Sequence, residues 1–596
     1  MVNLVNVRQT IFVILINSIA AISLQAQTIE TNPNTTEPTI PPPQDVNPPP
    51  APPPLPPTPP ASPTPPEELL PAPTTPSEEL LNTEETIIVT EFNFTGNTLF
   101  TTEELKEKFT QDLINQPLSL NRLLKIANDI ARLYAEQGYR TSGAIISLPE
   151  TTQQQGKGMV EVKVLEGELS EIQIIPQDGS FQLNPNYIRS RLNLAATKPL
   201  NIYRLQEALQ LLQLNPLIEG ISATLSTGAS PEQSILEVTV LEADTFNLQV
   251  FADNNRSPSV GSFRRGATLT EANLLGWGDR LDFSYANTDG SDAFDLAYTI
   301  PLNPQNGTLS FLYSDTENEV IESPFDVLDI ESESSSYELN LRQPVIQNID
   351  RNTQTFDEVA LGISAFWRGS TSSIEENSEP LSLGAEADGD INIFVLRFTQ
   401  EWTRQNAESV FALRSEFSVG LDAFDSTINE QIPGVARIPD SRFFSWRGQA
   451  QYVFLLAPET LFLIRGSLQI ANDALFGAEQ FSLGGANTVR GYRQDTLLTD
   501  NGLLASAELR IPIIQGFSES GIVQIIPFVD FGKGWNKSRE LNPDPQNLAS
   551  LGLGLLWQEE NFNFRFDYGI PLIDVDSRER ALQEQGIYLS LQWNLF

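Results

Sequence analysis

The chain has 596 residues and carries 36 lysines and arginines against 77 aspartates and glutamates, a formal net charge of −41 at pH 7. Cysteine and histidine are absent, which excludes disulfides, thiol nucleophiles, the usual zinc sites and Ser-His-Asp triads. The acidic balance argues against a nucleic-acid partner, and no phosphate-binding loop of the form G-x-x-x-x-G-K-[ST] occurs. We therefore expect no enzymatic activity, no cofactor and no metal.

Residues 1–26 have the organisation of a secretory signal peptide. Arg8 supplies the basic start, Ile11–Ile22 the apolar segment, and cleavage after Ala26 is compatible with the sequence. The alternative is a retained membrane anchor. Because this is the only long apolar run in the chain, we expect no transmembrane helix in the mature protein.

Residues 27–84 are dominated by proline, as in Pro48–Pro57. Such a composition cannot bury a core and favours an extended polyproline II conformation of about 3.1 Å per residue. We therefore predict a disordered linker. It could be a passive spacer or a docking strip for a periplasmic partner or the cell wall.

Two similar α+β units follow, each predicted in the order β-α-α-β-β. In the first, at 85–166, a strand over 87–94 precedes a capping box at Thr101–Glu104 and an amphipathic helix around 123–134. Strands at 144–148 and 159–165 complete it. The second, at 167–243, repeats the pattern with strands at 169–175, 221–226 and 234–242, and helices at 186–192 and after Asn201. Their functional element would be an exposed strand edge and its groove, which can add a strand from an extended client.

From Thr245 onward, short runs of alternating polarity replace the helical pattern. Tyr337, Leu339 and Leu341 face one way, opposite Glu338, Asn340 and Arg342, and residues 562–568 alternate aromatic and polar side chains. An apolar outer face with a polar lumen is typical of a transmembrane barrel. Sixteen strands are predicted, with starts near Thr245, Gly266, Arg280, Ala293, Thr308, Ser336, Glu358, Ile391, Ser409, Phe443, Thr460, Gly502, Ile522, Ser550, Phe562 and Gly586.

The connections are predicted to alternate in length. Asn303–Gly307 and Ala457–Glu459 read as short turns, whereas the acidic segments Asp315–Ser335 and Gly369–Asp390 read as long extracellular loops. The long connection between the eleventh and twelfth strands contains Gly484, Gly485 and a single arginine, Arg490.

The two adjacent glycines in that connection predict a tight hairpin, because glycine accepts positive φ and permits close backbone approach. The hairpin would deliver the guanidinium of Arg490 to one place. About forty residues later, Asp530 lies among apolar and small residues of a strand-like stretch, and arginine and carboxylate can form a bidentate pair. From the residues alone, a solvated loop arginine and a polar-face aspartate remain the alternative.

The run Leu483-Gly-Gly485, then Val489-Arg-Gly-Tyr492 and Phe528-x-Asp530-x-Gly532, resembles the paired signatures of the outer-membrane polypeptide translocators. Within them it is similar to the two-partner secretion transporters, relatives of the hemolysin activators and the filamentous hemagglutinin exporter. The resemblance covers residue 85 to the C-terminus. It implies two α+β POTRA domains, at 85–166 and 167–243, followed by a 16-stranded antiparallel transmembrane β-barrel at 244–596 with an inserted loop at 471–501.

The resemblance also implies roles for single residues. Arg490, at the tip of the loop folded into the barrel, would meet Asp530 on the inner wall and lock the loop. Solvent in the lumen would limit that pair to about 1–2 kcal/mol. Supporting motif residues are Val489, Gly491 and Tyr492 at the loop tip, Phe528 and Gly532 on the wall, and Phe596 as the C-terminal insertion signal.

The function implied is export of an unfolded exoprotein, bound in extended form by the POTRA domains and threaded through the barrel. An outer-membrane insertase and a passive porin or adhesin remain as alternatives. We expect a monomer in the outer membrane of a diderm bacterium, with POTRA domains in the periplasm. Its other partners would be outer-membrane lipid and, during biogenesis, the barrel assembly machinery.

Overall fold

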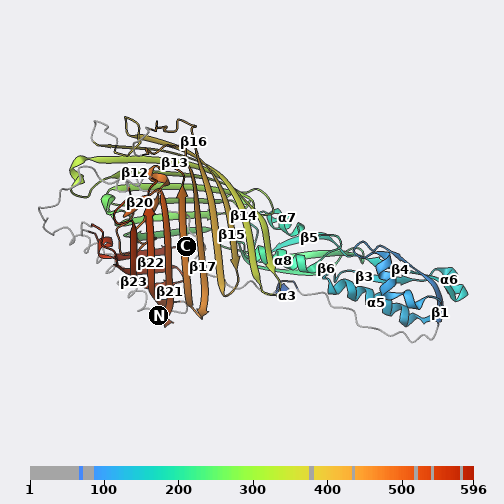
Figure 1. The fold of residues 1–596 in the computed structure, drawn as a ribbon. Coiled ribbons are helices and arrows are strands. Elements are labelled where there is room, and N and C mark those ends of the chain that lie inside the picture. The colour runs from blue at the N-terminus through green and yellow to red at the C-terminus, as the bar shows by residue number, and fades with distance from the viewer. Residues whose placement is uncertain are drawn as a thin grey trace.

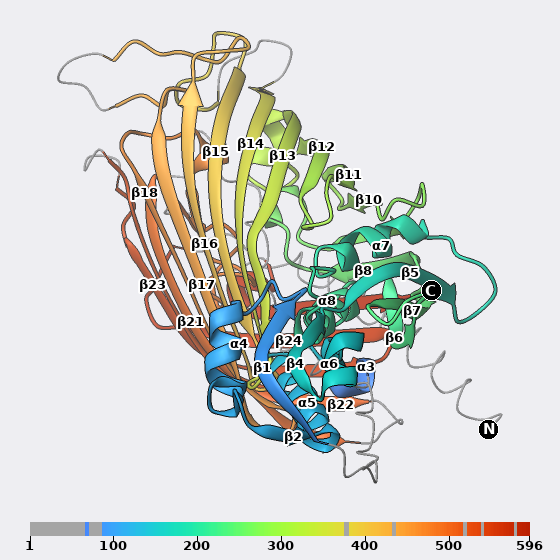
Figure 2. The same cartoon turned by 90° about the vertical axis from the view of Figure 1, so that its right-hand side faces the viewer.

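The computed structural model describes residues 66–70, 86–374, 381–431, 437–515, 521–537, 542–576 and 581–596. The predicted signal peptide at 1–26 and most of the predicted linker at 27–84 lie outside these residues. A large barrel occupies one end of the molecule, and two smaller units project from it in line (Figures 1 and 2). No helix among the described residues is long and apolar enough to cross a membrane.

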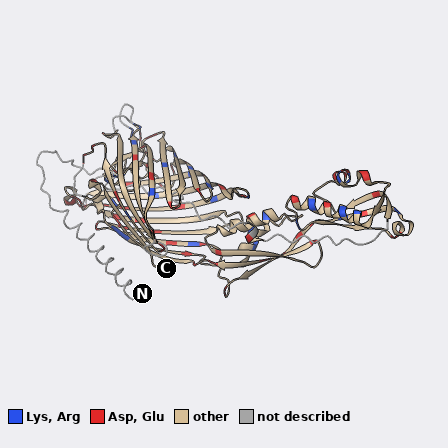
Figure 3. Ribbon diagram, turned by 90° about the horizontal axis from the view of Figure 1, so that it is seen from below, with Lys and Arg blue, Asp and Glu red and all other residues tan. Residues whose placement is uncertain are grey.

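The first unit wraps two main helices against a mixed sheet in the order β2-β1-β4-β3. Its elements are β1 (Thr86–Thr95), α4 (Thr102–Phe109), η1 (Gln111–Leu113), β2 (Pro117–Ser119), α5 (Leu120–Glu136), β3 (Gly143–Ser147), α6 (Glu150–Gln155) and β4 (Lys157–Leu165). The capping box predicted at Thr101 and Glu104 is present, with both reciprocal hydrogen bonds. Short β2 and α6 were not predicted, because neither has apolar periodicity. Lysines, arginines and carboxylates alternate along the helices of this unit (Figure 3).

Glu166 closes the first unit. Its carboxylate accepts hydrogen bonds from the backbone amides of Thr98 and Leu99, at 2.7 and 2.9 Å, and from the Tyr134 hydroxyl at 2.8 Å. Burial alone would raise the pKa of Glu166, but the hydrogen bonds from these residues outweigh it and lower that pKa.

The second unit has the three-stranded sheet β5-β7-β6, with β6 at one edge. Its elements are β5 (Glu168–Pro176), α7 (Pro185–Asn193), α8 (Ile202–Gln213), β6 (Ile218–Thr227) and β7 (Gln233–Glu242). Helix α8 buries Leu205 and Leu209 but also Gln206 and Gln210. The sheet of the second unit does not cover these glutamines, so other segments must pack against α8 to bury them.

Part of that packing corrects the prediction of an extended linker over 27–84. Residues Pro66–Leu69 form a short helix, α3, that packs against α8 and β6. Leu69 and Leu70 are buried in the core cluster of the second unit. The proline-rich composition of residues 27–84 as a whole masks these two adjacent leucines, whose apolar side chains allow the segment to dock.

The barrel is closed by sixteen antiparallel strands, with β25 paired to β8, as predicted. They are β8 (Phe246–Asp253), β9 (Arg264–Ala272), β10 (Arg280–Asn287), β11 (Ser291–Pro301), β12 (Thr308–Glu319), β13 (Ile330–Asp350), β14 (Thr355–Ile374), β15 (Asp390–Gln405), β16 (Ser409–Leu421), β17 (Phe444–Ala457), β18 (Thr460–Ala471), β21 (Asn501–Gln515), β22 (Ile522–Trp535), β23 (Asn547–Glu559), β24 (Phe562–Pro571) and β25 (Ile587–Asn594). Closure leaves no unpaired sheet edge in the hydrocarbon.

Strand β13 has the predicted alternation of faces. Tyr337, Leu339 and Leu341 are 44, 50 and 41 % exposed. On the opposite face the guanidinium of Arg342 pairs with Glu358 at 2.5 Å and Glu401 at 2.7 Å. An apolar wall toward lipid and a charged lumen follow from this period of two.

The two acidic loops were predicted too long. Most of Asp315–Ser335 is strand, because β12 continues to Glu319 and β13 begins at Ile330 rather than Ser336. Likewise β14 continues into the segment Gly369–Asp390 as far as Ile374. The backbone ladder persists beyond the apolar belt, where water solvates the acidic side chains, so hydropathy marks the edge of the lipid and not the end of the strand.

The second unit is tied to the barrel by contacts with three turns. The amide of Asn184 donates to the carbonyl of Gly276 at 2.8 Å, and Arg191 donates to Asn306 at 3.0 Å. From α8, the Gln210 amide donates to the Gln354 carbonyl oxygen at 2.7 Å. These contacts fix α8 at one mouth of the barrel.

Candidate functional site: the arginine hairpin in the barrel

The connection between β18 and β21 folds into a hairpin. Strands β19 (Phe481–Leu483) and β20 (Leu497–Thr499) pair with each other, and both pack on the barrel strand β22. Beyond β19 the chain turns through Gly484 and Gly485, whose φ angles are +110° and +97°. Only glycine adopts such angles without strain, as the sequence predicted for this turn.

Arg490 is fully buried and meets Asp530 in a bidentate pair. Its Nε and Nη2 donate to the two Asp530 carboxylate oxygens at 2.8 and 2.9 Å, and its backbone amide donates to Oδ2 at 3.2 Å. The guanidinium lies flat over the Phe528 ring, with Cζ 3.4 Å from the ring centroid. The structure therefore brings together the arginine, the aspartate and the aromatic residue of the wall motif.

Strand β22 points Asp530 inward by its period-two alternation. Phe528, Asp530 and Gly532 face the hairpin, whereas Val529 and Phe531 are exposed outside. The neighbouring strand β21 contributes Ser506, whose hydroxyl donates to Asp530 at 2.6 Å. At Gly532 a Cβ would lie 2.9 Å from side-chain atoms of both Leu483 and Val489, so this glycine makes room for the hairpin.

Further charged residues, not predicted as site residues, complete the network. Arg490 Nη1 also lies 3.1 Å from Glu508 and 3.5 Å from Asp567. Arg565 bridges the same two carboxylates, at 3.1 and 2.6 Å. Arg565 and Asp567 were predicted only as lumen-facing; their convergence with Glu508 depends on the strand register around the barrel, which is not readable from local alternation.

The loop-tip residues fit closely against β24 and β25. Gly491 has φ +101°, and a Cβ there would lie 3.2 Å from the carbonyl group of Gly569. Its amide donates to the Tyr588 hydroxyl at 2.8 Å, and that hydroxyl donates to the Tyr492 carbonyl at 2.5 Å. The Tyr492 hydroxyl in turn lies 2.8 Å from the Ala549 carbonyl oxygen. Tyr588 was not predicted as a site residue, and no local motif marks it.

Burial corrects the predicted environment of the lock. The pair was expected to be screened by water in the lumen, but Arg490 and Asp530 are both 0 % exposed. The hairpin core, formed by Phe481, Leu483, Val489, Tyr492 and Leu497 with wall residues Leu504 and Leu548, excludes water from it. Breaking a buried pair by removing one partner typically destabilises by about 3–5 kcal/mol.

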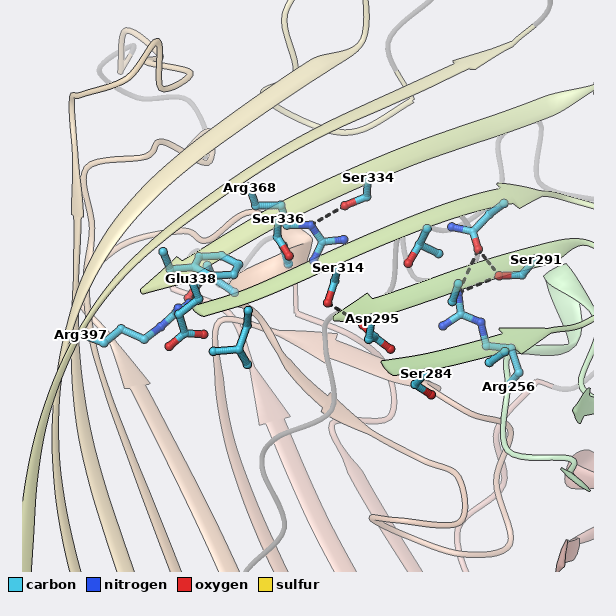
Figure 4. A pocket seen from close by; sticks show the side chains of 18 of the residues that line it. Arg256, Ser284, Ser291, Asp295, Ser314, Ser334, Ser336, Glu338, Arg368 and Arg397 are labelled. Atoms are coloured by element: carbon cyan, nitrogen blue, oxygen red, sulfur yellow. Dashed lines mark hydrogen bonds and ion pairs between the residues drawn. The ribbon is translucent and has the colours of Figure 1, made fainter. Parts of the chain in front are cut away.

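A separate cavity of about 620 Å³ lies elsewhere in the lumen, lined mostly by serines, arginines and carboxylates. There Arg368 donates to Ser334 at 2.8 Å and Arg256 to Ser291 at 3.2 Å (Figure 4). Glu479, at the base of the hairpin, pairs with Arg397 of β15 at 2.6 Å. In the described part of the chain, no group of three or more acidic side chains is placed to hold a metal ion.

Phe596 lies apart from the lock. Its side chain is 75 % exposed, and its ring centroid is 6.1 Å from that of Phe246 on β8. The C-terminal residue is therefore accessible beside the seam where the last strand meets the first.

Comparison with known proteins decides the family. A sequence model of the haemolysin secretion/activation proteins ShlB/FhaC/HecB matches residues 232–556, more than half of the chain. The chain belongs to this family. A model of the ShlB-type POTRA domain matches residues 87–167 of the transporter.

Individual relatives share most of its length. The outer membrane transporter CdiB of Dickeya dadantii is 22% identical over 483 residues, 77% of this chain and 78% of that protein. The heme/hemopexin transporter protein HuxB of Haemophilus influenzae is 24% identical over 477 residues, 76% and 78% of the two chains. The solved structure of CdiB from Escherichia coli has the same fold, with a TM-score of 0.64 at 19% identity, covering 89% of this chain and 94% of that one.

These findings confirm that the protein is a two-partner secretion transporter of the outer membrane with a periplasmic POTRA region. They favour this function over that of an outer-membrane insertase.

Proposed function

We propose that the transporter binds an unfolded exoprotein in the periplasm through its POTRA domains and exports it through the barrel. The Arg490–Asp530 pair would hold the inserted loop in a set position during the resting state. The bidentate contact between these residues, at 2.8 and 2.9 Å inside a closed barrel, is the observation that supports this role.

The proposed division of the chain follows from its sheets. We assign POTRA domains to 85–166 and 167–243 and the barrel to 244–596, with the inserted loop at 471–501. The separate sheets of the two N-terminal units and the closed barrel support these boundaries.

The client would join the POTRA domains as an added strand. An extended polypeptide can pair with an exposed sheet edge, and its side chains select the neighbouring groove. The periplasm supplies no nucleotide, so folding of the client outside the cell would drive its passage. This mechanism needs no catalytic residue, and we attribute no enzymatic activity to the chain.

Assembly of the transporter would depend on its last residue. We propose that the exposed Phe596 is read by the barrel assembly machinery when the barrel is inserted into outer-membrane lipid. The closed barrel, which leaves no edge strand free, supports function as a monomer.

Export tests the proposal directly. Deleting the gene should trap one large surface protein in the periplasm, whereas loss of many barrels from the membrane would indicate an insertase.

Arg490→Ala should abolish export while the barrel still migrates as a heat-modifiable species. Arg510→Ala is the matched control, because Arg510 pairs with Glu508 of its own strand at 2.8 Å and is not part of the hairpin. Normal export by Arg490→Ala would refute the lock.

A further inference from the structure

The segment Pro66–Leu70 packs against helix α8 and the edge strand β6 of the second unit, beside the barrel mouth (Figure 1). We call the surface that this segment covers the α8–β6 groove. Leu69 is 3 % exposed and Leu70 0 % exposed. Both belong to the hydrophobic cluster that contains Leu205 and Leu209 of α8. The groove therefore holds two adjacent leucines from a distant part of the chain.

The groove also recognises the main chain of this segment. Gln206 of α8 is only 4 % exposed, and its side-chain amide donates to the Leu70 carbonyl oxygen at 3.0 Å. Burial of a glutamine side chain is unfavourable unless it is hydrogen-bonded. Since its partner is a backbone carbonyl, which every peptide offers, the contact is suited to peptide binding.

The docked segment binds the second unit without being adjacent to it in the sequence. The whole first unit, from β1 to β4, lies between it and the second unit in the sequence. A four-residue helix has no stability of its own in water, so α3 persists because the groove holds it. Residues 71–85 join it to β1, so the segment is an intramolecular ligand that stays attached to the chain when it leaves the groove.

The sequence of the segment occurs twice. Glu67-Glu-Leu-Leu70 recurs eleven residues later as Glu78-Glu-Leu-Leu81, outside the described residues. The recurrence of two leucines after two glutamates, in a tract otherwise rich in proline, marks a short motif.

We infer that the α8–β6 groove is a peptide-binding site held in the resting transporter by the leader's own Glu-Glu-Leu-Leu motif. A client segment with adjacent large apolar residues must displace this motif to dock there, and the second copy can replace the first. The inference rests on the proposed export function. It adds an intramolecular competitor at the mouth of the barrel, where α8 also contacts the turn that contains Gln354.

The first test uses a fluorescein-labelled peptide of residues 65–72 and the full-length chain in detergent. A variant with Leu69, Leu70, Leu80 and Leu81 all changed to serine has an empty groove and should bind the peptide at least tenfold more tightly than the wild type, because only the wild type must first release its own motif. Gln206→Ala in that variant should weaken binding about fivefold or more. A peptide with both leucines changed to serine should not bind. Equal binding by wild type and variant would overturn the inference.

The second test does not depend on the fold of that variant. Leu70→Cys introduces the single thiol of a chain that has no cysteine. Excess unlabelled peptide should raise its alkylation rate several-fold, whereas the serine peptide should not. An unchanged rate would show that Leu70 is a permanent core residue and would overturn the inference. Neither assay needs a client, so failure here leaves the export assay, and the proposed function, independently testable.

Discussion

Replacement of Arg490 by alanine should release the hairpin from the barrel wall. The Asp530 carboxylate is 0 % exposed in the wild type. In the variant it keeps the Ser506 hydroxyl and the backbone amide of residue 490 as donors, but it loses both guanidinium contacts. Leaving one charge of a buried pair without its partner destabilises by about 3–5 kcal/mol. Since about 1.4 kcal/mol is tenfold in an equilibrium constant, the undocked fraction should rise by roughly two to three and a half orders of magnitude.

Thiol accessibility can measure that fraction. Val489 is 0 % exposed in the docked hairpin and belongs to the same buried cluster as Leu483 and Leu497. Val489→Cys therefore places a unique thiol where a small alkylating reagent reaches it only after the hairpin undocks. In this background, Arg490→Ala should raise the alkylation rate by at least about 100-fold, the lower bound set by 3 kcal/mol.

Matched variants separate the lock from general loosening of the barrel. Arg490→Lys keeps the charge but cannot form the two-pronged contact, so its rate should lie between those of the parent and the alanine variant. Arg510→Ala removes another arginine of the same network without touching the hairpin and should leave the rate near that of the parent. If Arg490→Ala also leaves the rate unchanged, the apolar hairpin core holds the loop alone and the reasoning fails.

Three further outcomes are expected. Tyr588→Phe leaves the Gly491 amide and Tyr492 carbonyl without their shared partner, so undocking measured by the same thiol assay should rise about 5- to 100-fold, for about 1–3 kcal/mol. Glu166→Gln should lower the free energy of unfolding of the first POTRA domain by about 1–3 kcal/mol at pH 7, as measured by pulse proteolysis in urea. The pKa of Glu166 is lower in the folded protein than in the unfolded chain. The extra stability of the wild type over the variant is therefore fully present above the unfolded-state pKa of about 4.3, and it is lost as the pH falls through the folded-state pKa. Deletion of Phe596 should reduce the heat-modifiable barrel in outer membranes several-fold; unchanged assembly would refute its role as an insertion signal.

The barrel was predictable because lipid imposes a period of two on every wall strand. Strand β22 shows this clearly: Val529 and Phe531 face outward while Phe528 and Asp530 face inward. The same signal fails beyond the membrane, as at Ile330, where β13 begins among glutamates and serines that carry no apolar alternation. Strand ends in water are set by the pairing of neighbouring backbones, which is a property of the assembled sheet.

The lock was predictable only as a pair. Arg490 and Asp530 stand in short motifs, so their meeting could be inferred from local sequence and resemblance. Glu508, Asp567 and Tyr588 come from three other strands, and the distance between any two of them depends on register accumulated around the barrel. Their charges and hydroxyl were visible in the sequence, but their convergence on the loop tip, with Glu508 and Asp567 at the Arg490 guanidinium and Tyr588 at the neighbouring backbone, was not.

The energy of the lock is small compared with what a folding client can supply. Burial of apolar surface contributes about 25 cal/mol per Å², so the 3–5 kcal/mol lost when one partner of the Arg490–Asp530 pair is removed equals about 120–200 Å² of surface. One buried aromatic side chain covers that area. A client that buries one such side chain against the transporter would therefore offset the cost of undocking the hairpin. In the proposed lock, the pair of Arg490 and Asp530 would keep the resting barrel occupied, and a docking client could open it without a nucleotide.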